Sequence, residues 1–239
     1  VFYGPSANGE YTIRIVVIWL ITAAIFFTIW LVFINVRGFK HAIDLVRGKY
    51  SDPNDAGEVS HFQALATAVS GTVGLGNIAG VAIAIAIGGP GATFWMIVAG
   101  FLGMSLKAAE CMLGVKYRQE HADGTVSGGP MYYIENGLGK KYKPLAVMFA
   151  VFGVLCAYFG IGTFAQVNSI VEITQISAGI PVVYTGIALT VVVAAVTIGG
   201  LKSISNVSSK VVPGMAVIYF FTTLGILVSF ADQVPGAIA

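Results

Sequence analysis

The sequence of 239 residues is poor in charge, since Asp, Glu, Lys and Arg make up only 10% of it. A soluble domain has roughly 25% of such residues. Hydrophobic residues reach 56%, and the formal net charge is only +2. This composition excludes an ordinary water-exposed domain. The chain is expected to lie in a lipid bilayer, with no nucleic-acid partner.

Cysteine and the common catalytic motifs are also scarce. Cys111 and Cys156 are the two cysteines, and they lack the close spacing of a zinc site. We expect two buried free thiols rather than a disulfide, because free cysteine usually packs as a small apolar residue. No Walker loop, HExxH or GxSxG pattern is present in the sequence. We therefore expect neither an enzyme nor an ATP-driven pump.

What the sequence does contain is a series of long apolar segments. A spanning helix needs roughly 20 apolar residues. Six segments near that length predict an all-α integral membrane protein with six transmembrane helices, at about residues 13–34, 62–87, 92–106, 144–176, 182–198 and 211–230.

Basic residues are confined to alternate linkers. The connections 88–91 and 177–181 contain no Lys or Arg. Because cytoplasmic loops are enriched in positive charge, the three basic linkers are expected inside and the N-terminus outside. Their cations are Arg37, Lys40, Arg47 and Lys49, then Lys116, Arg118, Lys140, Lys141 and Lys143, then Lys202 and Lys210.

The second apolar segment contains a run of small and polar residues near its middle, at residues 70–77. Gly74 and Gly76 flank Leu75, and each glycine costs a helix about 1 kcal/mol relative to alanine. Asn77 follows, and its amide is costly to leave unpaired in lipid. A broken helix at mid-membrane is typical of transporters that bind small charged solutes there.

Such a break would offer two kinds of ligand. Carbonyls of Gly71, Val73 and Gly74, with the Thr72 hydroxyl, suit a sodium ion. The helix that restarts near Asn77 points its positive end into the same gap and suits a carboxylate. The alternative is that these glycines serve close helix packing, for which the Gly76–Gly80 spacing is suitable.

Three other features lie outside this segment. Tyr158, Gly162, Gln166 and Ser169 share one face of the fourth segment, and an amide at Gln166 suits an amino-acid ligand. Residues 131–138 predict a short interfacial helix, with its tyrosines at headgroup level. The serines between residues 203 and 209 favour capping of the sixth helix, with lining of an inner exit path as the alternative.

Three stretches of this sequence carry a resemblance to a known family. GTVGLGNIAGVA at residues 71–82, GGPGATFWM at 88–96 and GGPMYY at 128–133 resemble the alanine/glycine:cation symporters, also called sodium:alanine symporters. The resemblance covers essentially the whole chain, and Val73 to Asn77 also resembles the unwound first core helix of neurotransmitter:sodium symporters.

The resemblance implies a fold of the leucine-transporter type, with two inverted five-helix repeats. Residues 1–60 would then form one extra transmembrane helix and a cytoplasmic linker. Residues 61–239 would form the first repeat, with a broken first core helix, and the second repeat is expected to be missing. The implied substrate-binding residues are Thr72, Gly74, Gly76, Asn77, Phe164 and Gln166, and the implied sodium ligands are mainly backbone carbonyls of Ser70, Gly71, Val73 and Gly74.

The resulting hypothesis is a secondary active symporter in the plasma membrane. It couples Na⁺ entry to uptake of a small neutral amino acid, alanine or glycine, by alternating access. One alternative is a truncated or non-transporting membrane partner. Another is a proton-coupled amino-acid transporter of the same fold, which is less favoured because residues 62–87 contain no ionisable side chain.

Overall fold

The computed structural model describes residues 3–5, 11–13, 15–51, 57, 59–122, 124–159, 164–232 and 236. Helices dominate the described residues, and the strands among them form two short antiparallel pairs. The pairs are β1 (Tyr3–Pro5) with β2 (Tyr11–Ile13), and β3 (Gln119–Glu120) with β4 (Val126–Ser127).

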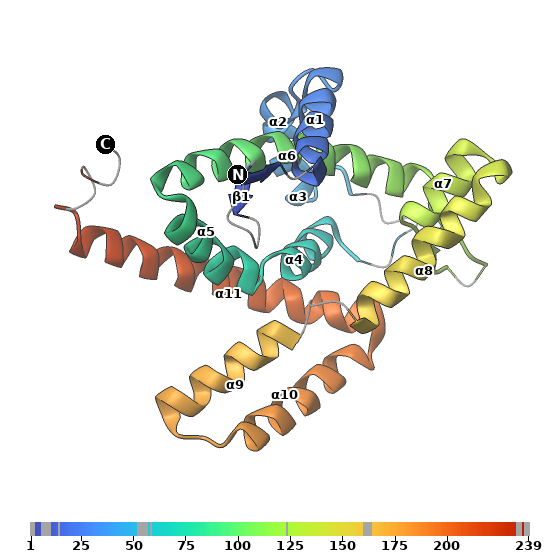
Figure 1. The fold of residues 1–239 in the computed structure, drawn as a ribbon. Helices are drawn as coiled ribbons and strands as arrows, with labels where there is room; N and C mark the ends of the chain where they lie inside the picture. Colours follow the sequence, from blue (N-terminus) through green and yellow to red (C-terminus); the bar gives the residue numbers. More distant parts are fainter. Residues whose placement is uncertain are drawn as a thin grey trace.

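The helices follow one another through short connections (Figure 1). In chain order they are α1 (Ile15–Trp30), α2 (Ile34–Arg37), α3 (Phe39–Val46), α4 (His61–Thr72), the π-helix η1 (Gly76–Gly80), α5 (Val81–Gly88), α6 (Pro90–Lys116), α7 (Pro130–Leu138), the 3₁₀-helix η2 (Lys140–Tyr142), α8 (Lys143–Phe159), α9 (Phe164–Ala178), α10 (Val182–Thr197) and α11 (Gly200–Ser229).

Several helices are long and apolar enough to cross a membrane. By length and composition these are α6, the stretch Lys140–Ala178 and α11, with the bent pair His61–Thr72 and Gly76–Gly88 as a fourth. The apolar helices α1 and α10 have 16 residues each, or about 24 Å at about 1.5 Å per residue. The chain is therefore helical and suited to several membrane crossings, and the count of six remains a prediction.

Small residues bring α1 against α6. Thr28 is 1% exposed, and its hydroxyl donates to the carbonyl of Ala24 at 2.7 Å and approaches that of Leu102 at 3.5 Å. Just beyond α1, Asn35 donates to the carbonyl of Phe101 at 3.2 Å. Close approach through small side chains and interhelical hydrogen bonds is the usual way to hold membrane helices together.

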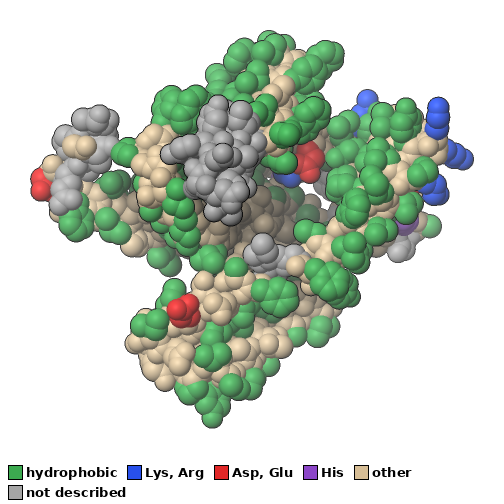
Figure 2. All heavy atoms as spheres, viewed as in Figure 1, with side chains coloured by type: hydrophobic (Ala, Val, Ile, Leu, Met, Phe, Trp, Pro, Cys, Tyr) green, Lys and Arg blue, Asp and Glu red, His purple; other side chains and the backbone are tan. Residues whose placement is uncertain are grey.

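Most large apolar side chains of the described residues lie on the surface, as the green atoms in Figure 2 show. The hairpin of α9 and α10 extends away from the helices around α4 and α6 (Figure 1). Such surfaces are compatible with lipid or with further protein, because neither exposes apolar atoms to water.

The structure confirms some local predictions and corrects others. The short helix expected at residues 131–138 is α7, although nothing tests its place at an interface. Burial raises the pKa of the Tyr133 phenol on this helix, and the Glu110 carboxylate raises it further. Cys111 and Cys156 are free as expected, but both are exposed rather than buried, because they lie on outward faces of their helices.

The expectation for the serine run was wrong. The serines do not precede the last helix as caps, because α11 begins at Gly200 and continues through all of them. Ser205 and Ser208 are buried, and α11 packs along α4. Ser205 donates to the carbonyl of Lys202 at 3.0 Å, so its hydroxyl is satisfied within its own helix. The serines thus give α11 a narrow face against its neighbour.

Candidate functional site

The second apolar segment is broken where the sequence predicts. Helix α4 ends at Thr72, Val73 is extended with φ −90° and ψ 115°, and the chain becomes helical again at Leu75. The segments His61–Thr72 and Gly76–Gly88 meet at an angle of 59°. The new segment begins as one π-helical turn, a form often found at functional sites.

Asn77 and Gly74 hold the break in place. The amide N–H of Gly74 donates to Asn77 Oδ1 at 3.1 Å, and the N–H of Asn77 donates to the carbonyl of Gly74 at 3.0 Å. Gly74 therefore gives its N–H to a side chain rather than to a helix carbonyl one turn back. Asn77 Nδ2 has no partner among the described residues, and it is free to donate to a carboxylate.

The break leaves several carbonyls without backbone donors. Among the described residues, no backbone N–H donates to the carbonyls of Ser70, Gly71 or Val73. The Thr72 hydroxyl donates to the carbonyl of Ala68 and lies 3.4 Å from that of Val69, so its hydrogen is directed back along α4. Its oxygen keeps lone pairs that can contact a cation. Four oxygen atoms that could bind a cation thus lie within four consecutive residues, 70–73.

Gln166 reaches the break from another helix. A Cβ atom placed on Gly74 would lie 2.6 Å from Gln166 Nε2 and 3.4 Å from its Cδ. The amide thus occupies the space that any side chain at position 74 would need. The structure therefore brings Gln166 of α9 against the break. Gly162, predicted on the same face, lies outside the described residues, while Phe164 begins α9 and is 71% exposed.

The other glycines at the break are not explained by packing within the described chain. A Cβ at Gly71, Gly76 or Gly80 would meet no described atom within 4 Å. Gly74 alone among these four makes a close approach. Close packing between described residues therefore explains Gly74 but not the other three.

A second wall of this region was not predicted from the sequence. A mostly apolar cavity of about 480 Å³ lies between the broken segment and α11. Tyr219 and Thr223 of α11 belong to its lining, and their i, i+4 spacing within an apolar segment was the sequence signal for them. Its lining is Val69, Val73, Asn77, Ile78, Val212, Met215, Ala216, Tyr219, Phe220 and Thr223.

The electrostatics of the break come from amides and carbonyls rather than from charged side chains. Between Phe62 and Gly88 the sequence has no ionisable residue. No group of three or more His, Cys, Asp or Glu within the described part of the chain is placed to hold a metal ion. The arrangement suits a hard monovalent cation on oxygen dipoles beside an anion on amide donors.

The chain is similar to known proteins over nearly all of its length. The sequence profile of the sodium:alanine symporter family matches residues 5–239. An uncharacterized transporter of Haemophilus influenzae is 47% identical over 214 residues, which cover 90% of this chain and 46% of that protein. The sodium/alanine symporter AgcS of Methanococcus maripaludis is 44% identical over 210 residues, covering 87% of this chain and 46% of AgcS.

A third relative is the putative sodium/proton-dependent alanine carrier protein YrbD of Bacillus subtilis. It is 41% identical over 214 residues, which cover 89% of this chain and 43% of YrbD. The chain thus spans about half the length of the relatives it matches. Because the family profile extends over almost all of its residues, the chain belongs to the sodium:alanine symporter family.

Proposed function

We propose that this chain forms the first part of a secondary active symporter that couples Na⁺ entry to uptake of alanine or glycine. The observation that carries the proposal is the break at residues 73–75. There, carbonyls that accept no backbone hydrogen bond lie close to the side-chain amides of Asn77 and Gln166. The names of AgcS and YrbD, both of which include alanine and sodium, support the same assignment.

In this proposal the two ligands bind side by side. Carbonyls of Ser70, Gly71, Val73 and Gly74 face the Na⁺ ion. Thr72, Gly74, Gly76, Asn77 and Gln166 surround the amino-acid headgroup, and Phe164 forms an adjacent apolar wall. Gly74 can contact both the Na⁺ ion and the headgroup, because its carbonyl oxygen has a second lone pair besides the one that accepts from the Asn77 N–H.

Coupling follows from charge neutralisation. A carboxylate in a low-dielectric site is costly unless a positive charge or several donors face it, and an isolated cation is equally costly. Each ligand lowers the cost of binding the other, and the resulting coupling is reciprocal. Alternating access would then move a nearly neutral assembly across the membrane rather than a bare ion.

The architecture completes the proposal. Residues 1–60 form an extra helix and linker, residues 61–239 form the first five-helix repeat, and a second, inverted repeat supplies the rest of the site. In this proposal the N-terminus lies outside the plasma membrane, as the basic linkers favour, and the break lies near the bilayer midplane. No chemical step is required, so the protein acts as a transporter rather than an enzyme.

The experiment is uptake of labelled alanine into liposomes that contain the whole protein carrying this chain. Uptake is expected with an inward Na⁺ gradient and not with K⁺ in its place. Uptake that ignores Na⁺ would contradict the coupling, and absence of any uptake would favour a non-transporting partner. Competition by unlabelled glycine and by larger neutral amino acids then defines the substrate range.

Proton coupling is the second candidate, and the name of YrbD, which includes both ions, is the observation in its favour. The lack of an ionisable side chain in the broken span favours sodium, because a proton carrier there needs a group that titrates. An inward proton gradient without Na⁺ separates the two, since it should drive uptake only in the proton-coupled case.

A further inference from the structure

The corner between α7 and α8, residues 138–143, carries uncompensated positive charge. Lys140 and Lys141 are exposed, and within the described residues no Asp or Glu oxygen lies within 4.0 Å of either amine. The nearby acids are already paired: Glu135 lies 3.3 Å from Lys143. The two lysines are therefore available to an anion from outside the described protein.

A third lysine is brought to the same corner by the end of α6. Asn136 donates to the carbonyl of Tyr117 at 3.2 Å, and a Cβ placed on Gly137 would lie 3.2 Å from the Tyr117 ring. The Tyr117 backbone and ring thus fix the end of α6 against the end of α7. Lys116 lies over this ring, with its amine 5.5 Å from the ring centroid.

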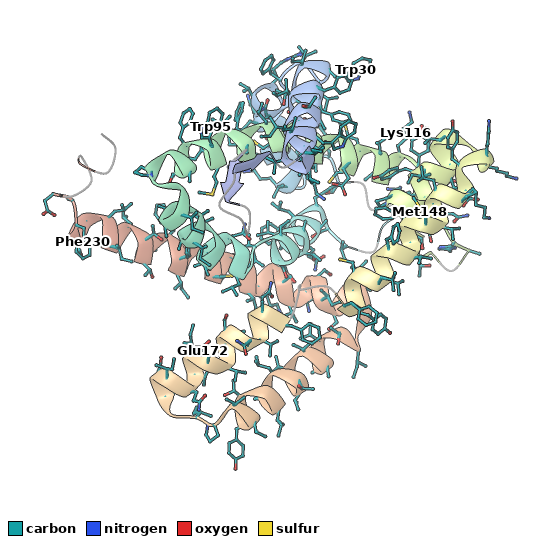
Figure 3. The ribbon with its side chains drawn as sticks, in the orientation of Figure 1. Trp30, Trp95, Lys116, Met148, Glu172 and Phe230 are labelled. Carbon is teal, nitrogen blue, oxygen red and sulfur yellow. The ribbon has the colours of Figure 1, made fainter. Side chains whose placement is uncertain are left out.

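Two exposed apolar side chains flank the lysines. Leu138 is 59% exposed and Tyr142 is 45% exposed, so one precedes and one follows the lysine pair. In Figure 2, blue Lys and Arg atoms gather at the end of the molecule where α7 meets α8, beside green apolar atoms. Lys116 lies at the same end in Figure 3.

The corner also stands at the boundary of a membrane-spanning stretch. Lys143 begins α8, and the apolar stretch that includes α8 is long enough to cross a bilayer. Residues just before such a stretch lie at the depth of lipid headgroups. Lysine stems extend along apolar surface and carry their amines to phosphates at this depth, while tyrosine rings favour the same interface.

We propose that the α7–α8 corner binds an anionic phospholipid of the bilayer, with Lys116, Lys140 and Lys141 around its headgroup. Leu138 and Tyr142 lie against the start of the acyl chains. An anionic headgroup is favoured because lysines that gather at one corner are stabilised by a negative surface, whereas a zwitterionic headgroup offers no net charge. This site is separate from the break and does not depend on which solute the protein carries.

The test measures binding of a fluorescent short-chain phosphatidylglycerol to the purified full chain in uncharged detergent. The variant K140Q/K141Q removes two of the three amines and is expected to weaken binding by roughly 25-fold, at about fivefold per lysine. K202Q/K210Q is the matched control, because it removes the same charge from α11. It should bind as the parent protein does, and salt should weaken the parent more than K140Q/K141Q.

Equal losses in the two double variants would overturn the proposal, because net charge alone would then explain binding. Binding of labelled phosphatidylcholine as tight as that of phosphatidylglycerol would overturn it too. If inorganic phosphate competes as strongly as unlabelled lipid does, the corner is a simple anion site and the lipid proposal is overturned. L138S should weaken binding of the lipid without changing binding of inorganic phosphate. Thermal unfolding of each variant checks that the fold is retained, and L138N offers a second uncharged substitution if L138S fails to fold.

Discussion

Two apolar helical segments of this protein respond in opposite ways to residues that disfavour helix. Helix α11 contains Pro213 followed by Gly214, yet it runs without interruption over 30 residues. The segment from His61 to Gly88 contains no proline, yet it bends by 59°. Proline is usually the stronger helix breaker, so propensity alone does not decide where a helix of this protein ends.

The difference lies in what replaces the lost hydrogen bonds. Pro213 removes one donor, and the turns on either side of it remain bonded. At the break, Asn77 offers Gly74 an acceptor that the regular helix does not, and so stabilises the non-helical path. A side chain that competes for a backbone N–H can therefore break a helix that low helix propensity alone would only destabilise.

Asn77→Ala tests this explanation most directly and should have the largest effect. It removes the acceptor of the Gly74 N–H and the free Nδ2 donor together. We expect Na⁺-driven alanine uptake by the whole protein in liposomes to fall by roughly 10- to 100-fold, the range for hydrogen bonds to charged groups. Asn168→Ala on exposed α9 is the control and should retain uptake. Unchanged uptake in Asn77→Ala would contradict a role for this amide.

Gly74→Ala should come next. The added methyl would lie 2.6 Å from Gln166 Nε2, so the amide must leave the break. Because the far end of a flexible side chain can move, we expect destabilisation of only about 1 kcal/mol, near the low end for overpacking. Uptake should nevertheless fall several-fold or more, because Gln166 no longer faces the ligand.

Gly80→Ala is the matched control for Gly74→Ala, since a Cβ at position 80 meets no described atom within 4 Å. It should leave uptake unchanged. Thermal unfolding and uptake are measured on both variants. Equal loss of uptake in the two would indicate that helix flexibility, rather than the position of Gln166, matters at this segment.

Pro213→Ala tests the other side of the comparison. If α11 already accommodates its proline, the alanine variant should gain one backbone hydrogen bond, and stability should rise by roughly 1 kcal/mol in thermal unfolding. Uptake should stay within about twofold of the parent. A large loss of uptake would instead show that α11 must bend at Pro213 during transport, which would make the two segments more alike.

Ser205→Ala should have the smallest effect. Ser205 is fully buried in α11, and its hydroxyl donates within its own helix, so alanine leaves no partner from another helix unsatisfied. We expect a change below about 1 kcal/mol in thermal unfolding. Ser205→Leu should cost about 1–3 kcal/mol by overpacking. If leucine is tolerated as well as alanine, α11 does not require a small residue there.

Local features of the fold could be predicted from the sequence because they depend on a few neighbouring residues. The break at Val73 is of this kind, and so is α7. The start of α11 could not be predicted correctly. Serines that suit a helix cap equally suit the narrow face of a packed helix, and only the neighbouring helix α4 distinguishes the two.

The candidate site divides in the same way. The sequence by itself determined that a polar, glycine-rich break lies within an apolar segment. In lipid the backbone groups freed by such a break can bond only to nearby protein groups or to a bound ligand, so polar residues beside glycines mark its position. Tertiary structure alone decided that Gln166 reaches Gly74 from another helix and that α11 adds Tyr219 and Thr223. Those contacts depend on how helices cross, and crossing is set by packing between segments distant in the chain.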